Sequence, residues 1–301
     1  MLKRNVAIIF PPMIGDSIMA IALVNEINTY GDIPYVYTTE YNFEIIYNLL
    51  VSTQVIKISN PEKYTFDIII DFLSNQESAV FNKNYQNSIK IGFPDGAMKY
   101  DISLKLPFNF RDFPATEIFL QALKLINIKT TSKQKLISKN KWAFNNQEII
   151  LIAPGAGNLN RCYELNDFII LADKLIQIGH IVMFILGPSE IKLKDLIKNH
   201  KYLVSNNISQ ALEILNRTKI VISSEGGFMH ICGFLGLPLL GIFRVSKIKN
   251  WFPYQLHYQK AIGHETNDYK TITKNNLNIN CAINKIIEIN SDLEVINKKN
   301  E

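Results

Sequence analysis

A glycine-rich turn between two short apolar runs constrains the fold of this chain more than any other feature. It lies in residues 221–243, VISSEGGFMHICGFLGLPLLGIF. The runs around Val221 and Leu239 are too short for helices and are bounded by glycine or proline, so they predict buried parallel strands. The Glu-Gly-Gly of residues 225–227 follows the first strand, where open α/β sheets bind ligands at the N-terminus of the next helix. This turn predicts a phosphate site, or else an ordinary turn whose glycines supply positive φ.

Two more segments repeat the pattern of strand, glycine-containing turn and helix. They are residues 5–27, NVAIIFPPMIGDSIMAIALVNEI, and residues 149–168, IILIAPGAGNLNRCYELNDF. Apolar strands alternate with amphipathic helices in both halves of the chain, which is typical of parallel sheets wrapped by helices. The predicted strands span 6–10, 35–38, 55–58, 68–71, 149–153, 181–186 and 220–223, and the predicted helices 18–29, 115–126, 166–178, 190–199 and 209–217.

Composition and charge predict a two-domain intracellular protein. The 301 residues are 47% hydrophobic, enough for two cores, which we place in residues 1–135 and 146–275, with a C-terminal helix and tail in 276–301 that can pack back on the first domain. Three scattered cysteines indicate neither a zinc site nor disulfides, so a reducing cytoplasm is expected. The double proline and Asp16 near the N-terminus argue against a signal peptide or a membrane span.

The net charge of +5 is unevenly distributed. Residues 118–147 contain no acidic residue and six lysines, at positions 124, 129, 133, 135, 139 and 141. This stretch predicts either peripheral contact with an anionic inner membrane or an acidic glycolipid, or a solvated linker over residues 128–148. No nucleic-acid motif accompanies it, so no nucleic-acid partner is expected.

Together the three glycine-containing segments resemble the bacterial heptosyltransferases of glycosyltransferase family 9. The matching residues are Gly15-Asp16, then Pro154-Gly155-Ala156 with Arg161 and Tyr163, and then Glu225-Gly226-Gly227 with His230 and Leu235-Gly236-Leu237-Pro238. This chain has Glu225, Arg161 and Tyr163 where the family usually has Asp, Lys and Trp. It also has Arg244-Val245-Ser246 where Gly-Pro-Thr is typical. The charge types are retained.

The resemblance implies a GT-B fold, in which two Rossmann-like domains face a cleft, and an inverting glycosyltransferase. A heptose would pass from an ADP-activated donor to a lipopolysaccharide core or a related glycan. Two rivals remain: a sugar-nucleotide epimerase of the same architecture, and a non-catalytic relative that binds nucleotide-sugars. No Asp-x-Asp pair that could chelate a metal is present in the sequence, so catalysis is expected to need neither metal nor cofactor.

Roles for the site residues follow from the chemistry of inverting transfer, which needs a base for the acceptor hydroxyl and positive groups for the leaving diphosphate. Asp16 is the candidate base beside an acceptor-binding Gly15; alternatively Asp16 caps a helix that begins at Ser17 or Ile18. Arg161 would pair with diphosphate oxygens, or else is an exposed loop arginine. The remaining donor-binding candidates are Gly155 and Ala156 in the loop, the amides of Gly226, Gly227 and Phe228, His230, Glu225 for sugar hydroxyls, and Glu190 for the ribose.

Overall fold

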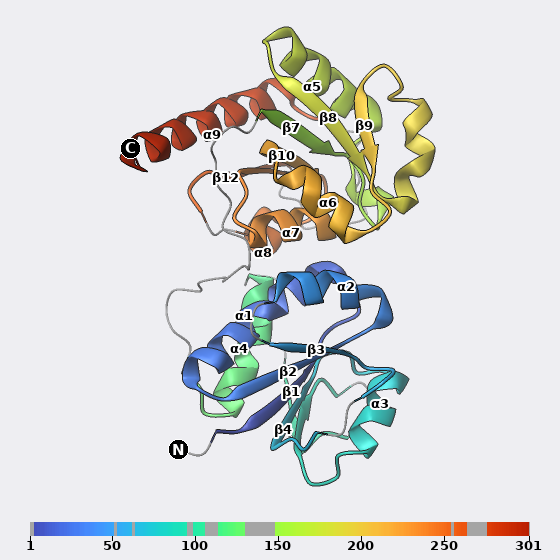
Figure 1. The fold of residues 1–301 in the computed structure, drawn as a ribbon, viewed down its shortest axis with the longest axis vertical. Helices are drawn as coiled ribbons and strands as arrows, with labels where there is room; N and C mark the ends of the chain where they lie inside the picture. The colour runs from blue at the N-terminus through green and yellow to red at the C-terminus, as the bar shows by residue number, and fades with distance from the viewer. Residues whose placement is uncertain are drawn as a thin grey trace. The chain divides into compact units, whose positions relative to one another are not determined.

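The computed structural model describes residues 3–50, 53–61, 64–94, 99–105, 114–129, 148–253, 256–263 and 276–300. Its chain divides into two units, residues 1–139 and 140–301, and each is built on its own six-stranded sheet (Figure 1). Residues 130–147, with Lys133, Lys135, Lys139 and Lys141, lie outside the described residues, as does most of the expected linker.

The first unit alternates strands and helices. Its elements are β1 (Asn5–Ile9), α1 (Ile14–Tyr30), β2 (Ile33–Thr38), α2 (Glu40–Leu49), β3 (Gln54–Lys57), β4 (Ile68–Asp71), α3 (Gln76–Lys83), β5 (Ile89–Gly92), β6 (Ile102–Ser103) and α4 (Ala115–Leu125). All strand pairs are parallel, in the order β3-β2-β1-β4-β5-β6. Every residue of β4 is buried, so both faces of the sheet are covered.

The second unit repeats this plan. Its elements are β7 (Ile149–Ala153), the 3-10 helix η2 (Leu159–Arg161), α5 (Leu165–Gln177), β8 (Ile181–Leu186), the 3-10 helix η3 (Pro188–Asp195), β9 (Lys201–Val204), α6 (Ile208–Leu215), β10 (Thr218–Ser224), α7 (Gly227–Phe234), β11 (Leu239–Phe243), α8 (Ile248–Trp251), β12 (Gln259–Gly263) and α9 (Ile279–Asn300). Its parallel sheet has the order β12-β11-β10-β7-β8-β9. The predicted α/β class with two parallel sheets is therefore confirmed.

The last helix packs on the second sheet. Ala282, Ile286, Ile289 and Leu293 of α9 are buried in one core with residues of β7, β8, β10 and β11 and of α5. A salt bridge of 3.0 Å from Lys260 Nζ to Asp292 Oδ2 joins β12 to α9. The expected contact of this helix with the first domain stays a prediction.

The structure corrects two predicted helices. The first helix starts at Ile14, four residues before the predicted Ile18, because the chain turns helical directly after Pro11-Pro12, and Gly15 lies inside its first turn. The predicted helix over 190–199 is instead the 3-10 helix η3. No side chain of η3 is fully buried, and only Leu193 packs partly against the core, so little packing favours the α-helical form over tighter turns.

Candidate functional site

The two glycine-rich turns of the second unit lie at the point where its strand order reverses. From β7 the chain adds β8 and β9 on one side of the sheet, whereas β10, β11 and β12 extend the other side. β7 and β10 are neighbours, and the turns at 154–157 and 225–227 follow their carboxyl ends. Such a switch point is where doubly wound sheets bind their ligands.

A side-chain hydrogen bond and close packing join the two turns. The Ser224 hydroxyl donates a 2.8 Å hydrogen bond to the Pro154 carbonyl. Gly226 is fully extended, with φ 178°, so it does not need the left-handed conformation that the alternative reading of the turn assumed. A Cβ at Gly226 would lie 3.0 Å from Ala156 Cβ. Glycine at this position therefore permits close approach of the two turns.

Glu190 packs against the first turn. Its Oε2 accepts a 2.6 Å hydrogen bond from the Gly187 amide, and its Oε1 accepts one of 2.8 Å from the Ser189 hydroxyl. Any side chain at Gly155 would collide with Glu190, because its Cβ would lie 2.3 Å from Glu190 Cγ. The structure thus brings Glu190 to the Gly155 loop, although its carboxylate is occupied by local donors.

Arg161 and Glu225 form an ion pair across the two turns. Arg161 Nη1 lies 3.4 Å from Glu225 Oε1; the arginine side chain is 41% exposed, whereas that of the glutamate is 2% exposed. Burial raises the pKa of Glu225, and the neighbouring Ser246 and Arg161 oppose that rise. The Ser246 hydroxyl and amide are close enough to lower this pKa. Glu225 Oε2 and Ser246 Oγ are nevertheless buried without a well-formed hydrogen bond in the described part of the chain.

His230 is a buried, neutral imidazole on the first turns of α7. Burial lowers its pKa to about 4, and the positive charge of Arg161 contributes to the shift. At neutral pH it can therefore accept or donate a hydrogen bond but supplies no positive charge to a phosphate. The cation that acts on His230 is Arg161.

His230 should make the protein less stable in acid. Its folded pKa lies below the value of about 6.5 for an unfolded histidine. The contribution of His230 to the free energy of unfolding is therefore fully present above pH 6.5 and is lost as the pH falls toward 4. Between pH 7 and pH 5 the loss should be on the order of 2 kcal/mol. Urea denaturation at both pH values should show a smaller fall in unfolding free energy for His230→Gln than for wild type. The exposed His257 offers a control, and equal losses in wild type, H230Q and H257Q would contradict the assignment.

The environment of Cys162 disfavours a nucleophilic thiolate. It follows Arg161 in the loop, and burial raises the pKa of its thiol to about 11. The reactive thiolate is therefore scarce at neutral pH.

The N-terminus of α7 lies beside the two glycine-rich turns. Its first intrahelical hydrogen bond runs from the His230 amide to the Gly226 carbonyl, so the amides of Gly227 and Phe228 have no acceptor within the helix. Both residues are half-buried and follow the carboxyl end of β10. Such amides, with the helix dipole, favour an anion.

Asp16 lies in the first unit, in the first turn of α1. The N-cap of that helix is Met13, which makes no side-chain capping bond, so the alternative reading of Asp16 as the N-cap is wrong. Gly15 and Asp16 are half-buried beyond the carboxyl end of β1. Two side chains hold the preceding turn: Ser17 Oγ donates to the Pro11 carbonyl at 2.8 Å, and Asn42 Nδ2 donates to the Pro12 carbonyl at 2.9 Å. These two hydrogen bonds hold the backbone segment that leads into the helix turn of Asp16.

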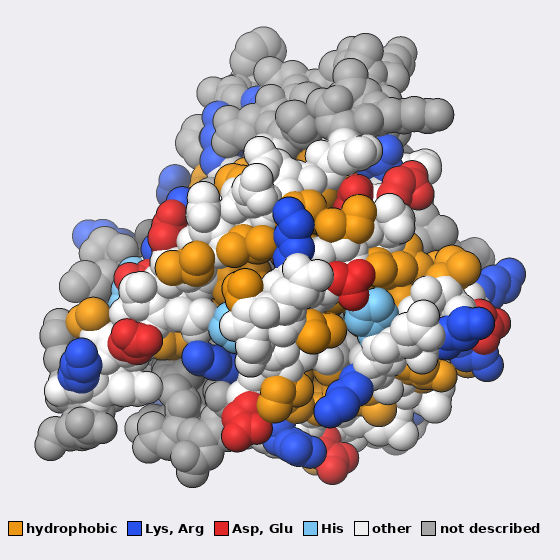
Figure 2. Space-filling view, turned by 90° about the horizontal axis from the view of Figure 1, so that it is seen from above, with side chains coloured by type: hydrophobic (Ala, Val, Ile, Leu, Met, Phe, Trp, Pro, Cys, Tyr) orange, Lys and Arg blue, Asp and Glu red, His pale blue; other side chains and the backbone are white. Residues whose placement is uncertain are grey.

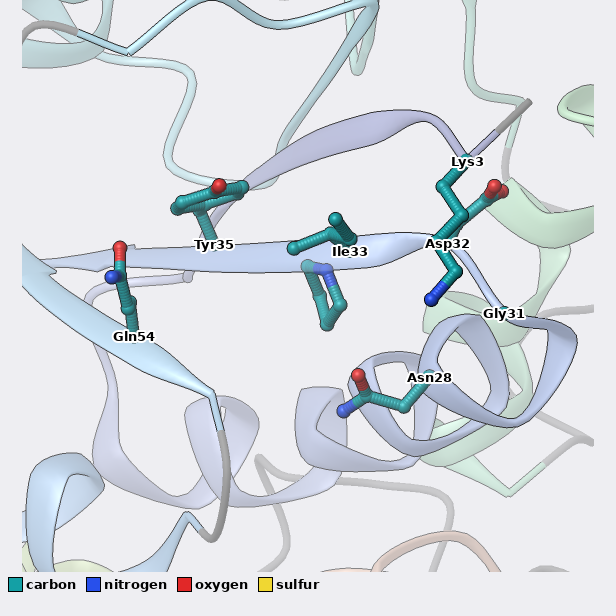
Figure 3. Close-up of a pocket in the computed structure, with 8 residues that line it drawn as sticks. Lys3, Asn28, Gly31, Asp32, Ile33, Tyr35 and Gln54 are labelled. Atoms are coloured by element: carbon teal, nitrogen blue, oxygen red, sulfur yellow. The ribbon is translucent and has the colours of Figure 1, made fainter.

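A pocket of about 420 Å³ lies at the amino ends of the strands of the first sheet, away from Asp16 (Figure 3). Its lining includes Lys3, Gly31, Asp32, Ile33 and Gln54, at or before the amino ends of β1, β2 and β3. Asp32 is bound there by Arg4, with Nε to Oδ2 at 2.8 Å. Because ligands of such sheets bind at the carboxyl ends, this pocket is not part of the candidate site.

Sequence reasoning missed three residues at the carboxyl ends of β10 and β11. These are Ser224, Arg244 and Ser246. Arg244 and Ser246 had been noted only as departures from a family pattern, although a position after an apolar strand was itself a usable signal. Among the residues that the structure describes, no group of three or more His, Cys, Asp or Glu side chains could hold a metal ion. On the face shown in Figure 2, described basic and acidic side chains are interspersed.

Three comparisons with known proteins bear on this geometry. A sequence model described as glycosyltransferase family 9 (heptosyltransferase) matches residues 62–281. A search of curated proteins found no significant match. Among solved structures, E. coli heptosyltransferase WaaC with ADP has a TM-score of 0.75 at 14% identity, covering 95% of this chain and 99% of that one. E. coli ADP-heptose lps heptosyltransferase II gives 0.73 at 14%, covering 96% and 99%. The iron-containing dodecameric TibC of E. coli gives 0.54 at 10%, covering 91% and 66%. These likenesses show a GT-B heptosyltransferase fold.

Proposed function

The chain belongs to glycosyltransferase family 9, and from that membership we propose that it is an inverting enzyme that transfers a heptose from an ADP-activated donor to a lipopolysaccharide core or a related glycan. The observation that carries the proposal is the arrangement around Arg161, where two joined glycine-rich turns and the N-terminus of α7 meet at a switch point. ADP is the proposed nucleotide because WaaC was solved with ADP and with ADP-2-deoxy-2-fluoro heptose.

The proposed reaction divides its chemistry between the two units. The Asp16 carboxylate takes the proton of the acceptor hydroxyl, whose oxygen attacks the anomeric carbon of the donor. The bond from that carbon to the diphosphate breaks, and its electron pair leaves with ADP. Arg161 and the amides of Gly227 and Phe228 hold the negative charge that builds on the leaving group.

Glu225 and Glu190 are the proposed contacts to the rest of the donor. Glu225 takes sugar hydroxyls, and Glu190, packed on Gly155, takes the ribose. His230 contributes a hydrogen bond as a neutral ring. Gly155 and Ala156 keep the loop close to the phosphates, and Gly15 borders the acceptor.

We place the enzyme in the cytoplasm, with peripheral contact at an anionic membrane where a glycolipid acceptor would lie. None of the described helices is both long and apolar enough to cross a bilayer. The proposed membrane contact uses the lysines of residues 118–147, of which Lys124 and Lys129 are described. Nucleic acid has no place in this reaction.

An assay with ADP-heptose and a lipopolysaccharide core acceptor, with and without excess EDTA, tests the function. Release of ADP should depend on the acceptor, invert the anomeric configuration and persist in EDTA, because protein cations and helix amides carry the leaving-group charge. Conversion of the donor without acceptor would indicate an epimerase. Donor binding without turnover would indicate a non-catalytic relative. Complete loss in EDTA, restored by Mg²⁺ or Mn²⁺, would refute metal independence; the iron in TibC makes this arm informative.

A further inference from the structure

Arg244 is the first residue after β11, so it lies at the carboxyl ends of the strands of the second sheet, as the loop of Arg161 does. Its Nη1 donates a 2.7 Å hydrogen bond to the backbone carbonyl of Cys162, which is 82 positions earlier in the chain. Cys162 directly follows Arg161, so a half-buried guanidinium holds the backbone next to the proposed phosphate ligand.

No carboxylate among the described residues pairs with Arg244. Its remaining buried donor, Nε, has no hydrogen-bond partner in the described part of the chain. Arginine is thus used here although one of its donors is unsatisfied, which is unfavourable in a buried position. The contact that it does make is to the loop of Arg161.

The segment that carries Arg161 needs such an anchor. Arg161 ends the three-residue 3-10 helix η2, and its side chain is half-exposed, with a long 3.4 Å contact to Glu225. Within the turn, the Arg161 amide donates to the Asn158 carbonyl at 3.0 Å. A single short turn of this kind is only weakly stabilised by its own hydrogen bonds.

We propose that Arg244 is a positioning residue for donor binding, which holds the Cys162 carbonyl so that Arg161 is directed at the leaving diphosphate. The proposal rests on the proposed function of Arg161. Arg244 acts through Arg161, so its removal should matter only while Arg161 is present.

A double-mutant cycle on ADP affinity, measured by calorimetry, tests this coupling. Arg244→Met should weaken ADP binding by about three- to tenfold in wild type and leave it unchanged in an Arg161→Ala background. Arg244→Lys, which can still donate to the Cys162 carbonyl, should restore most of the affinity. Arg217 offers a matched control, because this exposed arginine precedes β10 at the amino end of the strand, and Arg217→Met should bind ADP as wild type does.

Two results would overturn the proposal. Equal losses from R244M in both backgrounds would show that Arg244 contacts the nucleotide itself. Unchanged affinity of R244M in wild type would show that it positions nothing. Amide hydrogen exchange over residues 158–163, measured without nucleotide, supplies an independent readout: R244M should speed it and R217M should not. Unchanged exchange would refute the anchor even if wild type failed to bind ADP, a failure that by itself would count against the proposed function.

Discussion

Replacing Asp16 by asparagine should lower the rate of sugar transfer by about 10²–10⁴-fold, the range for loss of a general base. Asparagine keeps the size of the side chain and much of its hydrogen bonding but cannot take the acceptor proton at neutral pH. ADP affinity should change little, because the proposed donor groups all lie in the second unit. Rates and affinities are measured by ADP release at saturating donor and by calorimetry.

A structural role for Asp16 makes a different prediction. Asp16 sits in the first turn of α1, where its charge favours the helix dipole by about 0.3–1 kcal/mol. Glu117 occupies the first turn of α4 in the same unit and is exposed, so Glu117→Gln is a matched control for loss of charge at a helix start. If D16N and E117Q lower the melting temperature alike and D16N keeps a near-normal rate, Asp16 is not the base.

Much of the fold could be predicted because buried parallel strands have an unambiguous pattern. The apolar run of residues 149–153 is buried at every position, as predicted for a central strand. Boundaries at glycine and proline were less predictable. The Gly15-Asp16 pair indicated a turn, but two prolines before it had already ended the strand and the helix was under way.

Several helical elements were not recognised from the sequence. α2 and α3 were not predicted, and α3 begins with a capping box between Asn75 and Ser78 rather than with an apolar stripe. η3 had the composition of a helix but buries none of its side chains. Tertiary packing decides between α-helix and 3-10 helix in such segments, and packing is not written in the local pattern.

The positions of the candidate site residues could be predicted from the sequence, but their contacts could not. A basic residue, an acidic residue and glycines at the carboxyl ends of strands all followed from the pattern of strands and turns. The bond from Arg244 to Cys162 joins loops 82 residues apart, and no periodicity reports it. The reason for Gly226 was also hidden, because the Ala156 that it approaches belongs to another strand's loop.

Replacing Arg161 by alanine should weaken ADP binding by about 1.5–3 kcal/mol, or roughly tenfold to 150-fold, the range for a hydrogen bond to a charged group. The Arg161–Glu225 ion pair of the nucleotide-free protein is weak, because the contact is long and the arginine is half-exposed. Its loss in R161A should therefore change the measured affinity little.

Arg161→Lys separates the contribution of positive charge from that of bidentate hydrogen bonding, since lysine keeps the charge but not the fork. The ADP affinity of R161K should fall between those of wild type and R161A. Arg217→Ala, at the amino end of β10, controls for loss of one positive charge. Calorimetry with ADP at two salt concentrations should show a weaker salt dependence for R161A than for wild type and R217A, since one charge-to-phosphate contact is gone. If R161A binds ADP as tightly as R217A does, the diphosphate is held by other groups, and the charge assignment at the centre of the proposed mechanism is wrong.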